Sequence, residues 1–339
     1  MEFNNNLIQM FNTNHKSYVY SPFSIHYLLT IFHEYTNGIT REEFNNAVPA
    51  INNVQSVITK LRDDNVKLVT KNYIEKTMIT DLKTKDDYVV SADFMKIANK
   101  EVVRINDTIA NETKDLIPNF LSPSIINNDT RMVLLNVLYF KMKWQYPFNK
   151  SVDYTFLKYN NENISVKMMR MEKEISCKYF ENNDFQAIYS PYNCSNNTYI
   201  MVIVKPKNEF VVMDQNGILN CDFRYQVCEV KIPKFTTEFE IEFNDALKSL
   251  NLNSMFNLNC VISNLIDRND LFVDKVIQKA KIIVDETGTE AAAVTAAIMH
   301  QECCRRPIPS VLFDANKTFQ YYIMHDDSKT TLFSGVFNG

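Results

Sequence analysis

Two long apolar runs constrain this chain more than any other feature of its sequence. Residues 132–140 read MVLLNVLYF, and residues 199–206 read YIMVIVKP. Near-continuous apolar runs of this length, rich in β-branched and aromatic residues, predict strands that are covered on both faces. A sheet of that kind needs further layers, and 339 residues are ample to supply them.

Other segments carry half-exposed strand patterns or helix start signals. Apolar and polar residues alternate at 238–243 (EFEIEF) and 279–286 (KAKIIVDE), which predicts two further strands. Ser21 followed by Pro22 predicts the start of a helix that ends before Asn37-Gly38. Thr40 with Glu43 has the spacing of a capping box, and a helical pattern covers 244–256 behind Asn244.

Early helices and later strands together predict an α+β chain with more than one sheet. No repeat, low-complexity tract or Gly/Ser linker interrupts the sequence, so we expect a single domain over residues 1–339. The net charge of −4 offers no excess of base to neutralise phosphates, which argues against a nucleic-acid partner.

Targeting and redox signals point to the cytoplasm. The N-terminus MEFNNNLIQMFNTNHKSYVY has no signal-peptide pattern, and no run of apolar residues is long enough to span a membrane. The seven cysteines are odd in number and irregularly spaced, which favours reduced thiols over a disulfide framework.

Catalytic motifs are missing from the sequence. It contains no phosphate-binding glycine loop, no G-x-S-x-G, no H-E-x-x-H and no C-x-x-C. His26 and His33 lie seven residues apart on one predicted helix, and His300 lies near Cys303 and Cys304. Neither group has the further ligand or orienting partner that a metal or catalytic site needs. We therefore expect no enzyme, no metal and no cofactor.

One stretch, VDETGTEAAAVTAAIMHQECCRRPIP at 284–309, demands a separate explanation. A strand pattern leads into a run of small residues and then into cysteines, arginines and prolines typical of an exposed loop. Alanine favours helices, but a helix would leave the preceding strand and the following prolines unexplained.

This stretch resembles the reactive-centre region of the serpins, the serine protease inhibitors. The matching hinge residues are Glu286, Gly288, Thr289, Glu290, Ala291, Ala292, Ala293, Val294 and Thr295. Further serpin-like motifs follow in the family's order across essentially the whole chain, namely YSPFSI, TRMVLLNVLYFKMKWQYPF, KIPKF, FDANKTFQYYI and LFSGVF.

The resemblance implies the serpin fold, with three β-sheets, eight or nine helices and an exposed reactive-centre loop at about 286–309. It implies shutter and breach positions at Ser21, Ser24, Asn136, Trp144 and Gln278. Gln278 stands where the family usually has histidine, and Thr318 stands where it has proline. The short N-terminus and the missing signal resemble the intracellular serpins of poxviruses.

The implied function is suicide-substrate inhibition of a host serine or cysteine protease, which would be trapped as a covalent complex. A monomer in the host cytoplasm that modulates apoptosis or inflammation fits this resemblance. The alternative is a serpin-fold protein that only binds or chaperones. A bulky or charged hinge would favour that alternative, whereas Thr289 and the alanine run favour an inhibitor.

The bond offered to the protease follows from the family's loop length. Fourteen positions after Gly288 stands Glu302, followed by Cys303, and this bond would suit an acid-preferring protease. Counting back from Phe313 points instead to the neighbourhood of Cys304. A shift to Arg305 or Arg306 would predict a trypsin-like target.

Overall fold

The structure is a computed structural model of the whole chain. It describes residues 7, 16–51, 54–63, 66–84, 86–171, 173–194, 199–210, 212–213, 215–288 and 310–339. Contacts group the chain into two compact units, each built from three segments. The first unit comprises residues 1–10, 20–140 and 238–281, and the second comprises 11–19, 141–237 and 282–339. The single domain remains a prediction.

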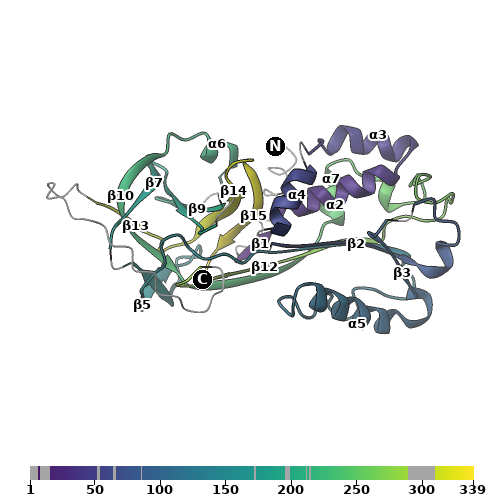
Figure 1. Cartoon of the computed structure of the whole chain (residues 1–339), viewed down its shortest axis with the longest axis horizontal. Helices are drawn as coiled ribbons and strands as arrows, with labels where there is room; N and C mark the ends of the chain where they lie inside the picture. Colours follow the sequence, from purple (N-terminus) through teal and green to yellow (C-terminus); the bar gives the residue numbers. More distant parts are fainter. Residues whose placement is uncertain are drawn as a thin grey trace. The chain divides into compact units, whose positions relative to one another are not determined.

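A five-stranded sheet, most of which belongs to the first unit, carries the longest buried strand (Figure 1). Its strands, in spatial order, are β11 (Phe235–Glu242), β12 (Lys275–Val284), β4 (Met132–Tyr139), β2 (Lys67–Glu75) and β3 (Val89–Ala92). β4 is antiparallel to β2 but parallel to β12, with Gln278 opposite Asn136. Two strands of the same direction therefore lie side by side in the middle of the sheet.

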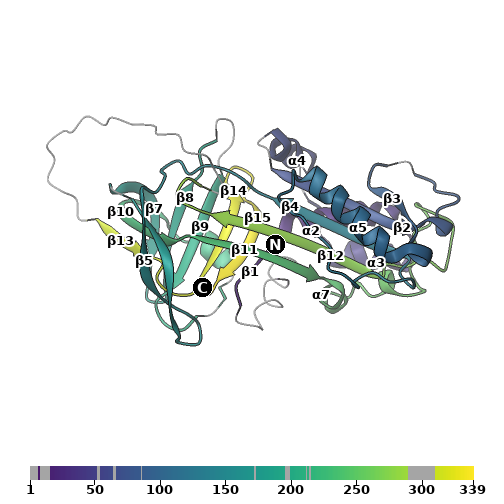
Figure 2. The ribbon, with the colours of Figure 1, turned by 90° about the horizontal axis from the view of Figure 1, so that it is seen from below.

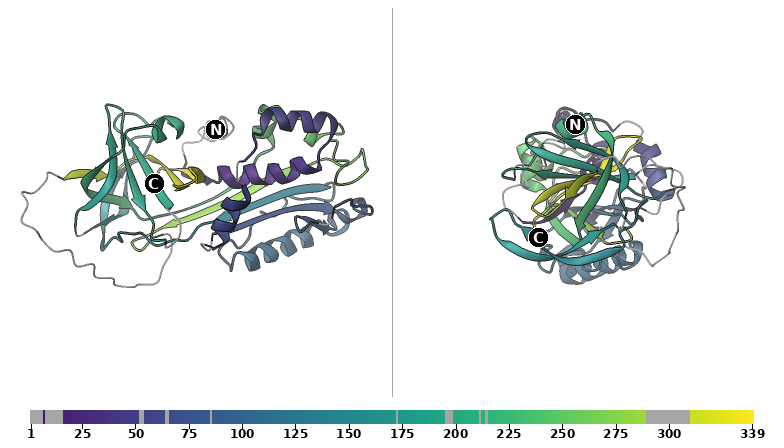
Figure 3. Two further views of the ribbon diagram at one scale, coloured as in Figure 1. Left: turned by 45° about the horizontal axis from the view of Figure 1, so that its top comes forward. Right: turned by 90° about the vertical axis from the view of Figure 1, so that its left-hand side faces the viewer.

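Helices cover both faces of this sheet, as the apolar run at 132–140 predicted (Figures 1 and 3). Alternate β4 residues, Val133, Leu135 and Val137, share a core with Val102 and Ile105 of α5. The other β4 face meets α2, and all eight β4 residues are buried. The helices of this unit are α2 (Pro22–Tyr35), α3 (Gly38–Ala47), α4 (Val54–Asp63), α5 (Phe94–Glu112), α7 (Asn244–Ser249) and the 3-10 turns η2 (Lys76–Met78) and η3 (Ser254–Phe256).

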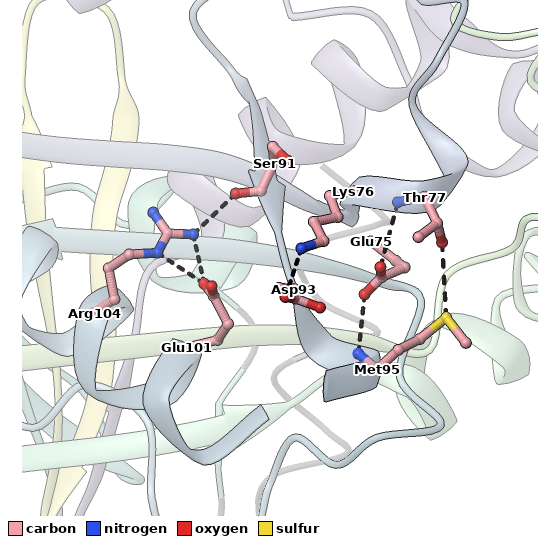
Figure 4. A network of polar contacts seen from close by, with 8 residues as sticks. All are labelled: Glu75, Lys76, Thr77, Ser91, Asp93, Met95, Glu101 and Arg104. Atoms are coloured by element: carbon pink, nitrogen blue, oxygen red, sulfur yellow. Dashed lines mark hydrogen bonds and ion pairs between the residues drawn. The ribbon is translucent and has the colours of Figure 1, made fainter. Parts of the chain in front are cut away.

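The carboxylate of Glu75, at the end of β2, holds the first turn of α5, and Lys76 pairs with Asp93 beside it (Figure 4). The carboxylate of Glu75, which is fully buried, accepts from the backbone N of Met95 at 3.0 Å and of Thr77 at 3.3 Å. Lys76 Nζ lies 2.6 Å from Asp93 Oδ2. A helix N-terminus has free N–H groups and a positive dipole end, so acidic side chains stabilise α5 at this place.

Two helix predictions need correction, and one is confirmed. Ser21 caps α2 and Pro22 begins it, as expected. α3 instead begins at Gly38, and Glu43 does not form a capping box with Thr40 because its carboxylate accepts from Ser254 N at 2.9 Å. α7 begins at Asn244 but ends at Ser249 rather than running to 256, since residue 251 adopts a positive φ of 66°.

The second unit contains a ten-stranded sheet (Figure 2). The path runs β1 (Tyr18–Tyr20), β15 (Thr330–Phe337), β14 (Phe319–His325), β9 (Tyr199–Pro206), β8 (Phe185–Pro191), β7 (Ile175–Glu181), β10 (Arg224–Pro233), β6 (Asn163–Arg170) and β5 (Lys150–Leu157), with β13 (Val311–Asp314) beside β10. A short helix, α6 (Gln215–Leu219), accompanies it. The apolar run at 199–206 forms β9, as predicted.

The described residues form two sheets rather than the expected three. The reason is β10, which pairs with β7 through 224–228 and with β6 and β13 through 228–233. This one long strand joins strands that would otherwise count as two sheets.

The described residues also form six α-helices and two 3-10 turns, rather than eight or nine helices. After α5 the chain runs as turns to β4, with positive φ at Lys114, Asp115, Asn119 and Ser124. Within the described part of the chain, no helix has the length and apolar character of a membrane span.

Candidate functional site

A buried polar network lies in the middle of the β12/β4 pair in the first unit. Gln278 Nε2 donates to Asn136 Oδ1 at 3.0 Å. Asn136 Nδ2 donates in turn to Thr70 Oγ1 on β2 at 3.1 Å. Side-chain hydrogen bonds therefore join three neighbouring strands in addition to their backbone bonds.

The same network reaches the first turn of α2. Gln278 Oε1 accepts from Ser21 N at 2.7 Å, and its Nε2 donates to Ser21 O and to Ser24 Oγ, each at 3.0 Å. The Ser24 hydroxyl donates to Asn136 Oδ1. Ser21 also accepts from Ser24 N as the helix cap. We call Ser21, Ser24, Asn136 and Gln278 the shutter network.

Burial makes the shutter network important for stability. All four of its residues are 0% exposed. A buried polar group that loses its partner costs about 1–3 kcal/mol, so a fully paired network favours the arrangement in which β12, β4 and α2 stay together. Gln278 connects β12 to its neighbours through both polar atoms of its side-chain amide. Its Oε1 accepts a hydrogen bond from α2, and its Nε2 donates to α2 and β4.

In the second unit, Trp144 holds the backbone that follows β12. Its Nε1 donates to Asp285 O at 2.9 Å, and its backbone N donates to Thr287 O at 3.0 Å. The indole is buried and stacks on Tyr192, with ring centroids 4.5 Å apart. The only tryptophan of the chain therefore contacts the start of the predicted hinge.

Residues 285–288 form a tight turn, which we call the hinge turn. Asp285 Oδ1 accepts from Thr287 N at 2.9 Å and from Gly288 N at 3.1 Å, the pattern of an Asx turn. Gly288 has a φ of 149°, and a Cβ there would lie 2.2 Å from Met142 O. Glycine is required at this position because any side chain would collide with the neighbouring backbone.

Glu286 is fixed by an ion pair and a backbone bond. Its Oε2 accepts from Lys234 Nζ at 2.9 Å, and its carbonyl accepts from Phe148 N at 2.7 Å. Burial raises the pKa of Glu286, but the hydrogen bond and the charge of Lys234, together with hydrogen bonds from the backbone and from Ser151, outweigh burial in sum and hold the pKa of Glu286 below its ordinary value. The Lys234 side chain is 48% exposed, so the pair contributes little to stability.

The structure brings the predicted residues together in two groups. Ser21, Ser24, Asn136 and Gln278 meet in the first unit, and Trp144, Glu286 and Gly288 meet in the second. Thr289–Thr295, Glu302 and Cys303 lie outside the described residues, so their roles stay predictions.

Sequence reasoning missed Thr70, Tyr192 and Lys234. Of these three residues, only Lys234 could have been found from the sequence, because it lies within the serpin-like motif KIPKF.

The histidines of α2 have structural surroundings. His26 Nε2 lies 2.5 Å from Pro49 O, and the His33 ring stacks on Phe44 at 5.4 Å. Across the described ranges, no three His, Cys, Asp or Glu side chains gather as metal ligands. The cysteines at 177, 221, 228 and 260 are free thiols, whereas His300, Cys303 and Cys304 lie outside the described ranges.

Comparisons with known proteins agree with this geometry. A family model described as Serpin (serine protease inhibitor) matches residues 1–339. An uncharacterized serpin-like protein of Acanthamoeba polyphaga mimivirus is 28% identical over 99% of this chain and 88% of its own length. Human plasminogen activator inhibitor 2 is 30% identical over 73% of this chain and 62% of its own length. Uncleaved ovalbumin is 17% identical but superposes with a TM-score of 0.84 over 100% of this chain and 98% of its own.

Proposed function

We propose that this chain, which belongs to the serpin family, inhibits a protease as a suicide substrate. The protease would cleave the segment that follows Gly288, and that segment would then insert into the five-stranded sheet. The family description, serine protease inhibitor, supports the general activity. The loop chemistry and the target are our inference.

The parallel β12/β4 pair is the observation that carries the proposal. β12 runs on into the hinge turn, where the chain begins to reverse its direction. A strand returning from that turn would run antiparallel to β12, and therefore also to β4. Its insertion would replace one parallel ladder with two antiparallel ladders, which are slightly more stable per residue.

The energy available from insertion is large enough to act on a bound enzyme. About a dozen residues that gain backbone bonds at ~1 kcal/mol net each contribute on the order of 10 kcal/mol. This figure is comparable to the whole stability of an ordinary domain, ~5–15 kcal/mol. The uncleaved form would then be kinetically trapped until the loop is cut.

The proposed chemistry uses the protease's own mechanism. Its serine or cysteine nucleophile attacks the carbonyl carbon of the scissile residue, the peptide C–N bond breaks, and the new amine end leaves with the proton. An ester or thioester then joins the loop to the enzyme. Insertion carries the enzyme away and distorts its active site before water can cleave that bond.

Small side chains in the loop suit insertion. Thr289, Ala291, Ala293 and Thr295 alternate, so they would face the same side of the sheet. We place the scissile bond at Glu302–Cys303, which selects an acid-preferring serine or cysteine protease. The mimivirus relative supports a viral source, and we propose a monomer acting in the cytoplasm of the host cell on apoptosis or inflammation.

The alternative is a serpin-fold protein that binds or chaperones without inhibiting. The likeness to ovalbumin concerns the fold alone and is compatible with it. The two functions differ in what happens after cleavage, because a binding protein would be cut without retaining the enzyme.

Incubation with granzyme B, caspases, a Glu-specific serine protease and trypsin tests the proposal. We expect one of these enzymes to form a complex that survives denaturing gels, with the cut after Glu302. Thr289→Arg should be cut without complex, because insertion would bury an unpaired charge at a cost of several kcal/mol. Glu290→Arg, whose side chain would face the opposite side, is the matched control. Cleavage without complex by every enzyme would overturn the inhibitory function.

A further inference from the structure

A hollow in the second unit has no part in the shutter network or the hinge turn. Its volume is about 260 Å³. It lies between the end of β5, the segment after β9 and the residues before β14, and its wall includes Leu157, Tyr159, Pro206, Glu209, Phe210 and Lys317. This volume suits a small ligand of about a dozen heavy atoms.

Lys317 supplies a cation to the wall of the hollow. Its Nζ donates to the carbonyls of Lys207 at 2.6 Å and Asn208 at 3.3 Å. Among the described residues no carboxylate forms an ion pair with it, and burial lowers the pKa of its ammonium group. Lys317 is half-exposed, so its charge is partly solvated, and an anion placed beside it would add a favourable charge-assisted hydrogen bond.

Charges of both signs surround Lys317. Burial is the main cause that lowers the pKa of Lys205, and the nearby charge of Asp314 opposes this shift more strongly than the charge of Lys317 adds to it. Lys158, in the wall, is already paired with Glu162 at 2.8 Å. Glu209 would repel a bound anion, because its exposed carboxylate also lies in the wall of the hollow.

Aromatic side chains supply a surface for the body of a ligand. Tyr159 and Phe210 meet edge to face, with ring centroids 6.2 Å apart. The position of Tyr159 is fixed by its backbone N, which donates to Asn338 Oδ1 at 2.8 Å. Aromatic walls with one convergent polar group are typical of small-molecule sites, where the polar group sets the orientation of the ligand.

We propose that this hollow binds a small aromatic carboxylate, with the carboxylate on Lys317 and the ring against Tyr159 and Phe210. The proposal does not depend on protease inhibition, since none of these residues belongs to the hinge or the shutter network. The competing explanation is that Lys317 only tethers the 207–208 turn. That explanation predicts no dependence of binding on the ligand's charge.

Titration calorimetry on the full chain decides between the two explanations. The probe is 2-naphthoate, and its neutral isostere is 2-naphthamide. We expect the carboxylate to bind about tenfold or more tightly than the amide, the ratio that one charge-assisted hydrogen bond supplies. Equal binding of the two probes, or no binding of either, would overturn the proposal.

Three variants test the residues. Lys317→Met should weaken naphthoate binding by about tenfold or more. Lys167→Met, at an exposed lysine on β6 of the same unit that pairs with Asp153, should leave it unchanged. Glu209→Gln should strengthen it by removing a repelling charge. If Lys317→Met unfolds the protein, the Glu209→Gln result and the comparison of the two probes still distinguish carboxylate binding from a tethering role of Lys317. Unchanged affinity in Glu209→Gln together with equal probe binding would leave only the tethering role.

Discussion

Gln278 Nε2 donates to Asn136 Oδ1 at 3.0 Å, although 142 positions separate the two residues. They face one another on β12 and β4, the two strands that would separate to admit a new strand. Separation would break this bond and leave buried amides unpaired. If the loop inserts as we propose, the shutter network would oppose opening of the sheet until the energy of insertion compensates for the lost hydrogen bonds.

Removal of the Gln278 amide should lower stability. Gln278→Ala leaves Ser21 N and Asn136 Oδ1 short of a partner in a buried site, so we expect the free energy of unfolding to fall by about 1–3 kcal/mol. Denaturant unfolding measures this loss. Gln55→Ala, at an exposed residue of α4, is the control and should change little. Equal effects of the two substitutions would contradict a role for the network.

Alanine at Gly288 should destabilise the hinge turn. The added Cβ would lie 2.2 Å from Met142 O, whereas a Cβ at Gly38 would lie 3.8 Å from the nearest atom. Gly38→Ala is the control for a glycine with positive φ, because its φ of 50° lies in the left-handed helical region and leaves space for a methyl group, whereas the φ of 149° at Gly288 is adopted almost only by glycine. Gly288→Ala should cost about 1–3 kcal/mol more, the usual range for overpacking. Thermal unfolding of both variants tests this, and a larger loss for Gly38→Ala would refute it.

The Glu286–Lys234 pair should give a small dependence of stability on pH. The folded pKa of Glu286 lies below its ordinary value of 4.5, so the stabilising effect is complete above about pH 4.5. It is lost as pH falls through the lowered pKa. The exposure of the pair limits the effect to less than about 1 kcal/mol.

Melting curves of the wild type and Glu286→Gln at low salt measure this dependence. The wild type should be the more stable at neutral pH, and the difference should shrink below about pH 4.5. A difference that grows on acidification would show that the carboxylate is not stabilised by Lys234.

Trp144 should report on the hinge. As the only tryptophan, it donates to the backbone of 285 and 287, so insertion of the adjacent segment would change its surroundings. We expect cleavage of the loop to shift the tryptophan emission in the wild type but not in Thr289→Arg. Identical emission before and after cleavage in both proteins would argue against movement at this place.

Secondary structure was predicted best where all the residues that determine an element are neighbours in the sequence. The apolar runs produced β4 and β9 because nine or eight consecutive residues carry the whole pattern, and Ser21-Pro22 began α2 because the cap bonds lie within one turn. Prediction failed where distant residues compete. Glu43 has the right spacing for a cap at Thr40, but Ser254, 211 positions away, donates to its carboxylate instead.

The sequence by itself determined the main kinds of element, the run of small residues after Gly288 and the absence of the usual catalytic motifs, because each of these is a pattern of neighbouring residues. Only the tertiary structure decided that β12 pairs in parallel with β4 and that Gln278 contacts four polar atoms. It also placed Lys317 and Glu209 in the wall of one hollow. Burial and pairing depend on which distant segments meet, and one sequence read along its length does not contain that information.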